Sequence, residues 1–154
     1  MKPIRRVLHA TDFSPASRRA FDTALSLAKS LEAPLTIVYV LAPITVVPEQ
    51  YIDVNTMERL DRQAREWGMR QLNRLAARAK TAGVDATALF RDGDPAEQIV
   101  RACRSTRSGL IVVGTHGRRG LRRFLLGSVA ERVVRTTTCS VLTVRPDGFR
   151  FELP

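Results

Sequence analysis

The sequence predicts an α/β fold in which a parallel five-stranded sheet carries helices on both faces. Five short apolar runs alternate with segments of helical periodicity, and this alternation is typical of parallel strands joined by crossover helices. The run 110–113 is apolar throughout, as expected of a central strand covered on both faces. At 154 residues, the chain is long enough for one domain with a sizeable core.

The first strand is predicted over residues 4–10, an apolar run that only two arginines interrupt. A helix follows, because Ser14 can cap its first turn and Pro15 suits the first helical position. Apolar residues at helical spacing extend this helix to Leu31. The second strand is predicted over residues 35–41, where β-branched and aromatic side chains are concentrated.

Residues 42–54 contain two prolines and are predicted to form a loop, and the sequence leaves open whether it closes over a ligand. A long helix is predicted over residues 55–82, because apolar side chains recur along one of its faces. Gly83 is expected to end this helix. Alternating apolar residues then predict a third strand over residues 84–91.

Asp94 and Glu97 have the spacing of a reciprocal capping box and predict the start of another helix. Gly109 is expected to close that helix, just before the apolar run 110–113. A loop rich in glycine and arginine follows over residues 114–127.

A short helix over residues 128–136 and a last strand over residues 140–144 complete the alternation. The domain is expected to span residues 1–146, and residues 147–154 to form a C-terminal tail of open role.

The positive charge is concentrated in one segment. Residues 101–135 hold nine arginines and a single acid, a net charge of +8, whereas the other 119 residues together carry +2. A segment of this charge density favours a polyanionic ligand, such as a nucleotide or a nucleic acid.

Membrane and secretory classes are not expected. No apolar run approaches the roughly 18–20 residues that cross a bilayer, and the N-terminus has no long apolar signal core. The two cysteines make neither a disulfide framework nor a metal quartet, so a reduced, cytoplasmic protein is expected. Cys103 is expected to be a small buried side chain, and Cys139 to stand at the start of a strand.

Two loops are placed to bind a ligand, because open parallel sheets bind at the carboxyl ends of strands where the strand order reverses. They are residues 10–14 after the first strand and residues 114–128 after the fourth. The second loop leads into a helix near Ser128, and the free N–H groups of a helix start favour an anion. Its glycines allow close backbone approach, and four arginines can neutralise further charge.

Together these parts describe a triphosphate cradle. Asp12, on the first loop, can accept a hydrogen bond from a ribose hydroxyl or a base amine, or help hold a phosphate-bound metal ion. The second loop is neither a Walker loop nor the dinucleotide GxGxxG motif. Glycines beside arginines are also common in solvated loops, so the pattern alone leaves both interpretations open.

The glycine spacing resembles a known family. Gly114-x-x-Gly117, nine further residues and then Gly127-Ser128 is similar to the G-2x-G-9x-G-[S/T] pattern of the nucleotide-binding universal stress proteins. Residues 10–14, 129–133 and 139–144 are similar to the same family, and the resemblance covers about residues 1–146. Cys139-Ser140 stands where proline is common in the family, a departure that we expect to be harmless.

The resemblance implies a three-layer Rossmann-like sheet of order 3-2-1-4-5, whose switch point lies between strands 1 and 4. It also implies ATP or a related adenine nucleotide as ligand, with Mg²⁺ or Mn²⁺ as a further candidate. Asp12 would contact the ribose or the metal ion, and Val40 would hold the adenine through backbone groups. The remaining contacts carried over by position are Ala10, Thr11, Gly114, Gly117, Gly127, Ser128 and Val129.

His116, Arg118 and Arg119 are not fixed by the motif, and their place in the loop assigns them to the phosphates. Members of the family commonly form homodimers through the edge of the last strand. Here that edge presents Val141, Leu142 and Val144, which would otherwise favour aggregation.

The sequence therefore predicts an adenine-nucleotide-binding, homodimeric universal stress protein that acts as a sensor or regulator. A slow ATPase or phosphotransferase is an alternative, although no general base is identifiable and His9 is expected on a sheet face. Nucleic-acid binding through residues 101–135 is a second alternative, but the basic loop has no interleaved aromatic residue apart from Phe124.

Overall fold

The central sheet contains five parallel strands in the order β3-β2-β1-β4-β5, which confirms the predicted topology. The structure is a computed structural model that describes residues 4–43, 53–115 and 127–145. The strands are β1 (Val7–Thr11), β2 (Leu35–Leu41), β3 (Ala86–Asp92), β4 (Leu110–Gly114) and β5 (Ser140–Val144). β1 pairs with both β2 and β4, so it lies at the centre of the sheet.

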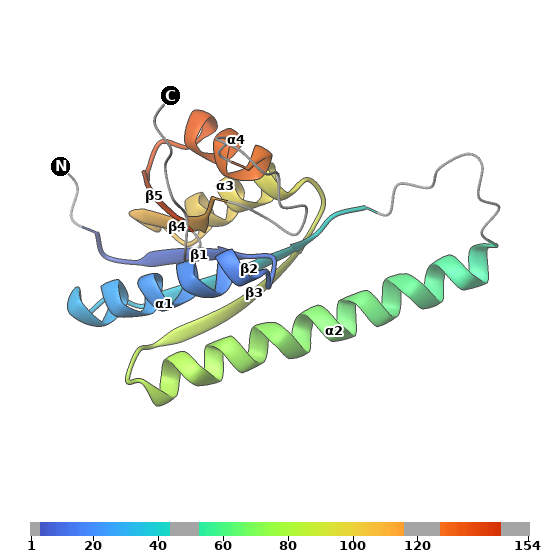
Figure 1. Ribbon diagram of the computed structural model, residues 1–154, viewed down its shortest axis with the longest axis horizontal. Helices are drawn as coiled ribbons and strands as arrows, with labels where there is room; N and C mark the ends of the chain where they lie inside the picture. The colour runs from blue at the N-terminus through green and yellow to red at the C-terminus, as the bar shows by residue number, and fades with distance from the viewer. Residues whose placement is uncertain (1–3, 44–52, 116–126, 146–154) are drawn as a thin grey trace, which may run out of the picture.

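Two helices cover each face of the sheet (Figure 1). The helices are α1 (Pro15–Ser30), α2 (Val54–Thr81), α3 (Pro95–Ser105) and α4 (Ser128–Thr136). One core lies under α1 and α2 and includes Phe21 and Leu72. The other lies under α3 and α4 and includes Ile99 and Val133. Within the described ranges, no helix is both long and apolar enough to cross a bilayer.

β1 begins at Val7, three residues later than predicted. Its neighbours set this limit, because Val7 is in register with Leu35 of β2 and Leu110 of β4, where both strands start. Residues before Val7 therefore have no complete strand on either side, although the Arg6 carbonyl still accepts from the Gly109 N–H at 3.0 Å.

β3 begins at Ala86, two residues after its predicted start. The Val84 N–H donates to the Ala79 carbonyl at 3.0 Å, so Val84 belongs to the end of α2. Gly83 has a φ of 85° and occupies the left-handed position there, as predicted.

The prediction that Gly109 closes α3 is wrong. The helix ends at Ser105, and Arg107 takes the left-handed position with a φ of 55°. The Ser108 N–H then donates to the Cys103 carbonyl at 3.0 Å, which completes the helix end. Gly109 instead joins the sheet through its hydrogen bond to Arg6.

Candidate functional site

The two loops singled out by the sequence start side by side at the carboxyl edge of the sheet. Ala10 of β1 is in register with Val113 of β4, and the chain leaves both strands within two residues of this pair. β2 extends the sheet on one side of β1 and β4 on the other, so the strand order reverses here. This is the position at which open parallel sheets bind ligands.

The loop after β1 is held by its own side chains. The Thr11 hydroxyl accepts from the Phe13 N–H at 3.0 Å and from the Ser17 hydroxyl at 2.8 Å. Asp12 Oδ1 accepts from the Ser14 N–H at 2.9 Å, and Ser14 caps α1 by accepting from the Ser17 N–H. The Thr11 side chain is buried and already hydrogen-bonded within the fold, so Thr11 would contact a ligand through its backbone.

Phe13 takes a left-handed backbone conformation with a φ of 61°, which is unfavourable for a bulky residue. Its ring packs against Tyr39 with centroids 4.8 Å apart and against Trp67 at 5.2 Å, edge to face. These contacts with β2 and α2 hold the turn that carries Asp12 in place.

Gly114 has a structural role at this edge. A Cβ atom there would lie 3.1 Å from the Ala16 carbonyl carbon and 3.2 Å from the Ser17 nitrogen. Both are backbone atoms in the first turn of α1, so the glycine permits α1 to approach β4 closely. The missing side chain of Gly114 therefore faces α1, on the opposite side of the sheet from α4.

The two ends of the loop after β4 meet. The Gly127 N–H donates to the Thr115 carbonyl at 2.6 Å, and the Thr115 N–H donates to the Val144 carbonyl at 2.9 Å. The intervening part contains the predicted phosphate contacts His116, Gly117, Arg118 and Arg119, all of which lie outside the described residues.

The start of α4 differs from the starts of the other described helices. The side chains of Ser14, Asp53 and Asp94 cap α1, α2 and α3, whereas Gly127 supplies no side-chain cap to α4. Ala130 is buried and anchors the first turn, while the predicted contacts Ser128 and Val129 are exposed. This helix start can therefore accept an external anion.

Ala10 and Val40 lie on the same side of the sheet as α4. Both are half-buried and pack against the core beneath α3 and α4. The predicted site residues thus divide between the two faces: Ala10, Val40 and the start of α4 share one face, and the side chain of Thr11 lies on the other.

An ion pair holds α4 to α3 near the same edge. Arg132 donates to Asp94 at 2.7 Å, and Asp94 also accepts from the Glu97 N–H at 3.0 Å as the cap of α3. The Arg132 guanidinium, more than the Glu97 N–H, lowers the pKa of the Asp94 carboxyl. The sequence indicated the cap, but nothing in it indicated a pair between residues 38 positions apart.

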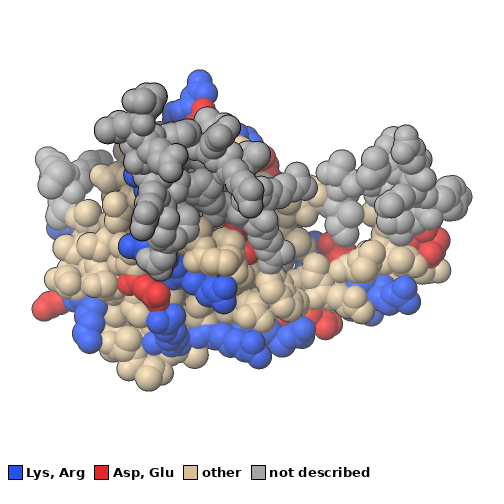
Figure 2. All heavy atoms as spheres, viewed as in Figure 1, with Lys and Arg blue, Asp and Glu red and all other residues tan. Residues whose placement is uncertain are grey.

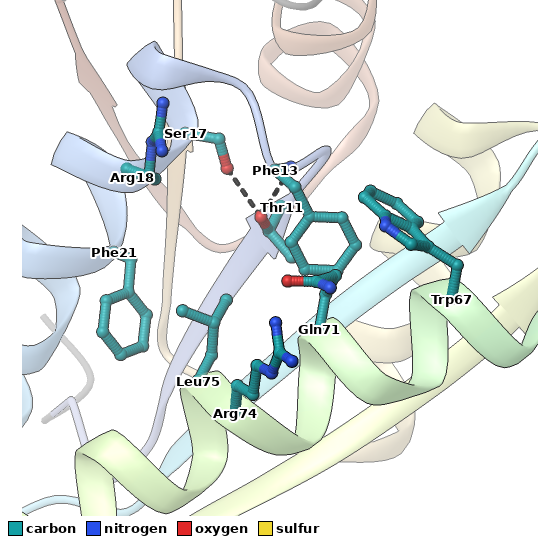
Figure 3. Close-up of a pocket in the computed structure, with 9 residues that line it drawn as sticks. All are labelled: Thr11, Phe13, Ser17, Arg18, Phe21, Trp67, Gln71, Arg74 and Leu75. Carbon is teal, nitrogen blue, oxygen red and sulfur yellow. Dashed lines mark hydrogen bonds between the residues drawn. The ribbon is translucent and has the colours of Figure 1, made fainter.

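A recess of about 310 Å³ opens on the other face, between α1 and α2 (Figure 3). Phe13 and Trp67 line one end, and Arg18 and Arg74 bring positive charge to its wall. Thr11 and Phe13 of the β1 loop are part of its lining, so the recess adjoins that loop. Sequence reasoning missed it because its walls come from two helices some 50 positions apart.

His9 is fully buried beside Phe21 and takes no part in the candidate site. Its Nδ1 donates to the Val112 carbonyl at 3.1 Å, and Nε2 has no partner among the described residues. Burial lowers the pKa of His9 to about 4, so the ring is neutral near pH 7. The described residues contain no cluster of three or more His, Cys, Asp or Glu that could hold a metal ion.

Comparison with known proteins agrees with this geometry. A model of the universal stress protein family matches residues 3–145. Universal stress protein YxiE of Bacillus subtilis strain 168 is 34% identical over 150 residues, which cover 91% of this chain and 98% of that protein.

Solved structures give the same result. A universal stress protein family member from Burkholderia pseudomallei has a TM-score of 0.74 at 32% identity, over 93% of this chain and 97% of that one. A universal stress protein solved in complex with cAMP has a TM-score of 0.68 at 28% identity, over 94% of this chain and 98% of that one. On the matched length and identity, the chain belongs to the universal stress protein family.

Proposed function

We propose that this protein binds an adenine nucleotide, with ATP as the first candidate, at the carboxyl edge between β1 and β4. The uncapped start of α4 carries the proposal, because it offers backbone N–H groups to a phosphate beside the Asp12 loop. The glycine spacing and the structural relative in complex with cAMP support an adenine nucleotide in particular.

In this proposal the α4 side of the sheet holds the ligand. Ala10 and Val40 flank the adenine, and Asp12 accepts from the ribose or, with the phosphates, holds Mg²⁺ or Mn²⁺. Gly127, Ser128 and Val129 meet the phosphates, together with the loop residues assigned from sequence. The protein would act as a cytoplasmic sensor or regulator in a stress response, reporting nucleotide occupancy to a partner.

Calorimetry with ATP, AMP and cAMP tests the proposal, as does mass spectrometry of nucleotide released from the purified protein. Asp12→Asn keeps the Oδ1 acceptor for the Ser14 N–H and removes the charge, so we expect about tenfold weaker binding with the fold intact. Asp53→Asn is the control, because Asp53 also accepts from a backbone N–H at a helix start, as the cap of α2, and lies away from the proposed site. Absence of binding by all three nucleotides at millimolar concentration would contradict the proposal.

A second variant tests the start of α4 directly. Gly127 has a φ of −53°, which any residue can adopt, and aspartate is a favourable helix cap. Gly127→Asp should therefore preserve stability while its carboxylate repels the phosphates and removes ATP binding. Gly127→Asn, a neutral cap of the same shape, should bind more ATP than Gly127→Asp. Equal affinities would exclude a phosphate at this helix start.

Nucleic-acid binding remains the alternative with an observation in its favour. α2 carries seven basic and three acidic residues, and Figure 2 shows basic side chains along the edge of the molecule where α2 lies. The positive surface is thus not confined to residues 101–135. Binding in a gel-shift assay that weakens steeply with salt, and that ATP does not compete away, would support this function.

Slow ATP hydrolysis, the other alternative, is tested by measuring ADP released in the calorimetry samples.

A further inference from the structure

Two cysteines that are 36 positions apart meet beneath the α3–α4 layer. The Sγ atoms of Cys103 and Cys139 lie 2.9 Å apart, and both thiols are free. Cys103 is on the last turn of α3, and Cys139 lies between α4 and β5. The sequence predicted the burial of Cys103 and the place of Cys139 just before a strand, but it gave no indication of this contact.

The surroundings of the pair make the two thiols unequal. Cys103 is buried, and its Sγ also lies 3.4 Å from the Ser108 carbonyl oxygen. Cys139 is partly exposed, and its Sγ lies 3.3 Å from the Thr137 hydroxyl. Burial first, and the hydrogen bond with Cys139 second, raise the pKa of the Cys103 thiol to about 12. A mild oxidant is therefore expected to react first with the partly exposed Cys139, and the buried Cys103 then reacts with the oxidised Cys139.

We propose that Cys103 and Cys139 are a redox modification site that forms an intramolecular disulfide when the protein meets a peroxide. A disulfide sulfur–sulfur bond is about 2.0 Å long, and the two Sγ atoms already lie 2.9 Å apart, so only a small movement of the two side chains is needed to form it. This inference does not depend on nucleotide binding, because neither cysteine belongs to the proposed nucleotide site.

The chemistry balances with hydrogen peroxide as the oxidant. The sulfur of Cys139 attacks one peroxide oxygen, the O–O bond breaks, and a sulfenic acid and one water form. The sulfur of Cys103 then attacks the Cys139 sulfur, and the S–O bond breaks. The leaving hydroxide takes the Cys103 proton as a second water, so two thiols lose two electrons to one peroxide.

The cross-link would close a loop that contains β4 and α4. At the other end of the same layer, Arg132 already joins α4 to Asp94, the cap of α3. The disulfide would therefore fasten the second end of the α3–α4 pair. Because a cross-link restricts the unfolded chain, the oxidised protein should melt at a higher temperature than the reduced protein.

Treatment of the reduced full chain with hydrogen peroxide tests the proposal. We expect the intact mass to fall by two hydrogen atoms, both free thiols to disappear, and peptide mapping to join Cys103 to Cys139 within one chain. The melting temperature should rise and return to its starting value with dithiothreitol. Unchanged thiols, or a disulfide between two chains only, would overturn the proposal.

Single-cysteine variants supply the controls. Cys139→Ser should leave the buried Cys103 as a free thiol and show no rise in melting temperature. Cys103→Ser should convert Cys139 into a sulfenic acid that a dimedone-type reagent traps, since no second thiol lies beside it. If peroxide raises the melting temperature of either variant as much as that of the natural protein, the disulfide is not the cause.

Discussion

Two helix ends place ordinary side chains where glycine is favoured. α1 and α3 end at Glu32 (φ 49°) and Arg107 (φ 55°), both exposed, with the same pair of backbone hydrogen bonds that Gly83 forms after α2. The left-handed conformation costs an L-residue with a Cβ about 1–2 kcal/mol. The strain at Glu32 and Arg107 is thus local and removable.

We expect Glu32→Gly and Arg107→Gly each to stabilise the protein by about 0.5–1 kcal/mol, since relief of strain exceeds the added entropy of the unfolded chain. Gly83→Ala should destabilise it by about 1 kcal/mol, although a Cβ there meets no atom within 4 Å. Urea unfolding checks all three variants. A loss of stability in both glycine variants would contradict the assignment of strain.

His9 makes stability depend on pH. Its pKa is lowered from 6.5 to about 4 by burial, so the unfolded chain binds a proton in a range where the folded protein does not. The stability that the neutral ring contributes is therefore complete above pH 6.5 and is lost as the pH falls toward 4.

Urea unfolding between pH 7 and pH 4 should show this loss. We expect the natural protein to lose about 3 kcal/mol more over this range than His9→Gln, whose side chain does not titrate. The test compares the change in unfolding free energy between pH 7 and pH 4 in the two proteins, so a difference in their stability at pH 7 does not affect it. Parallel pH profiles in the two proteins would show that His9 is not responsible.

At the scale of elements, the sequence predicted every strand and helix in the right order, because hydrophobic periodicity is a local property. The error at β1 came from partners distant in sequence, whereas the errors at β3 and α3 came from the hydrogen bonds with which a helix ends. The predicted first strand began at Ile4, but β2 and β4 start in register with Val7 and provide no strand partner for the residues before it. Glycine was expected to close α3, yet the chain closes it with Arg107.

The sequence predicted the elements that surround the candidate site but not the contacts between them. The strand ends and the uncapped start of α4 lie where the pattern indicated. No local pattern shows that the Thr11 hydroxyl is used by Ser17, or that Gly114 makes room for α1. His116 through Arg119 stay predictions, as do the tail after residue 146 and closure by loop 42–54, much of which lies outside the described residues.

The contact of α2 with the sheet depends on Gly68. A Cβ at Gly68 would lie 2.6 Å from Tyr39 Cε1 and 3.2 Å from Phe90 Cε2. The Tyr39 ring is itself packed against Phe13, Trp67 and Phe90, so it has little room to move. Glycine at this position is therefore a packing requirement of the helix–sheet interface.

Gly68→Ala should destabilise the protein by about 1–3 kcal/mol through overpacking, despite the roughly 1 kcal/mol preference of helices for alanine. Ala77→Gly, at an exposed position of α2, is the control and should cost about 1 kcal/mol. Thermal unfolding compares the two. A Gly68→Ala protein as stable as the natural one would show that the Tyr39 and Phe90 rings move aside for the added methyl group, and would contradict the packing requirement.

At the scale of the molecule, β5 ends the order of the described strands, and no described strand pairs with its outer edge. Leu142 on β5 and Val134 on α4 are 36% and 45% exposed. Exposed edges that carry apolar side chains pair readily with a second chain. We therefore keep the proposal of a homodimer through Val141, Leu142 and Val144.

Leu142→Lys should convert this dimer into a monomer, because a lysine on an edge strand opposes pairing. Leu31→Lys, at an exposed position beyond the end of α1, is the control and should leave the assembly unchanged. Sedimentation equilibrium at micromolar concentration distinguishes the two states. A natural protein that is monomeric there would refute the dimer.

The pairing of β1 with β4 cannot form until late in protein synthesis. The hydrogen bond from His9 to Val112 joins residues 103 positions apart, and β4 is translated long after β1 and β2. At about 5–20 residues per second, ribosomes need on the order of 5–20 s to cover that distance. Throughout this interval one edge of β1 has no partner, and a growing chain in this state is a natural client for chaperones.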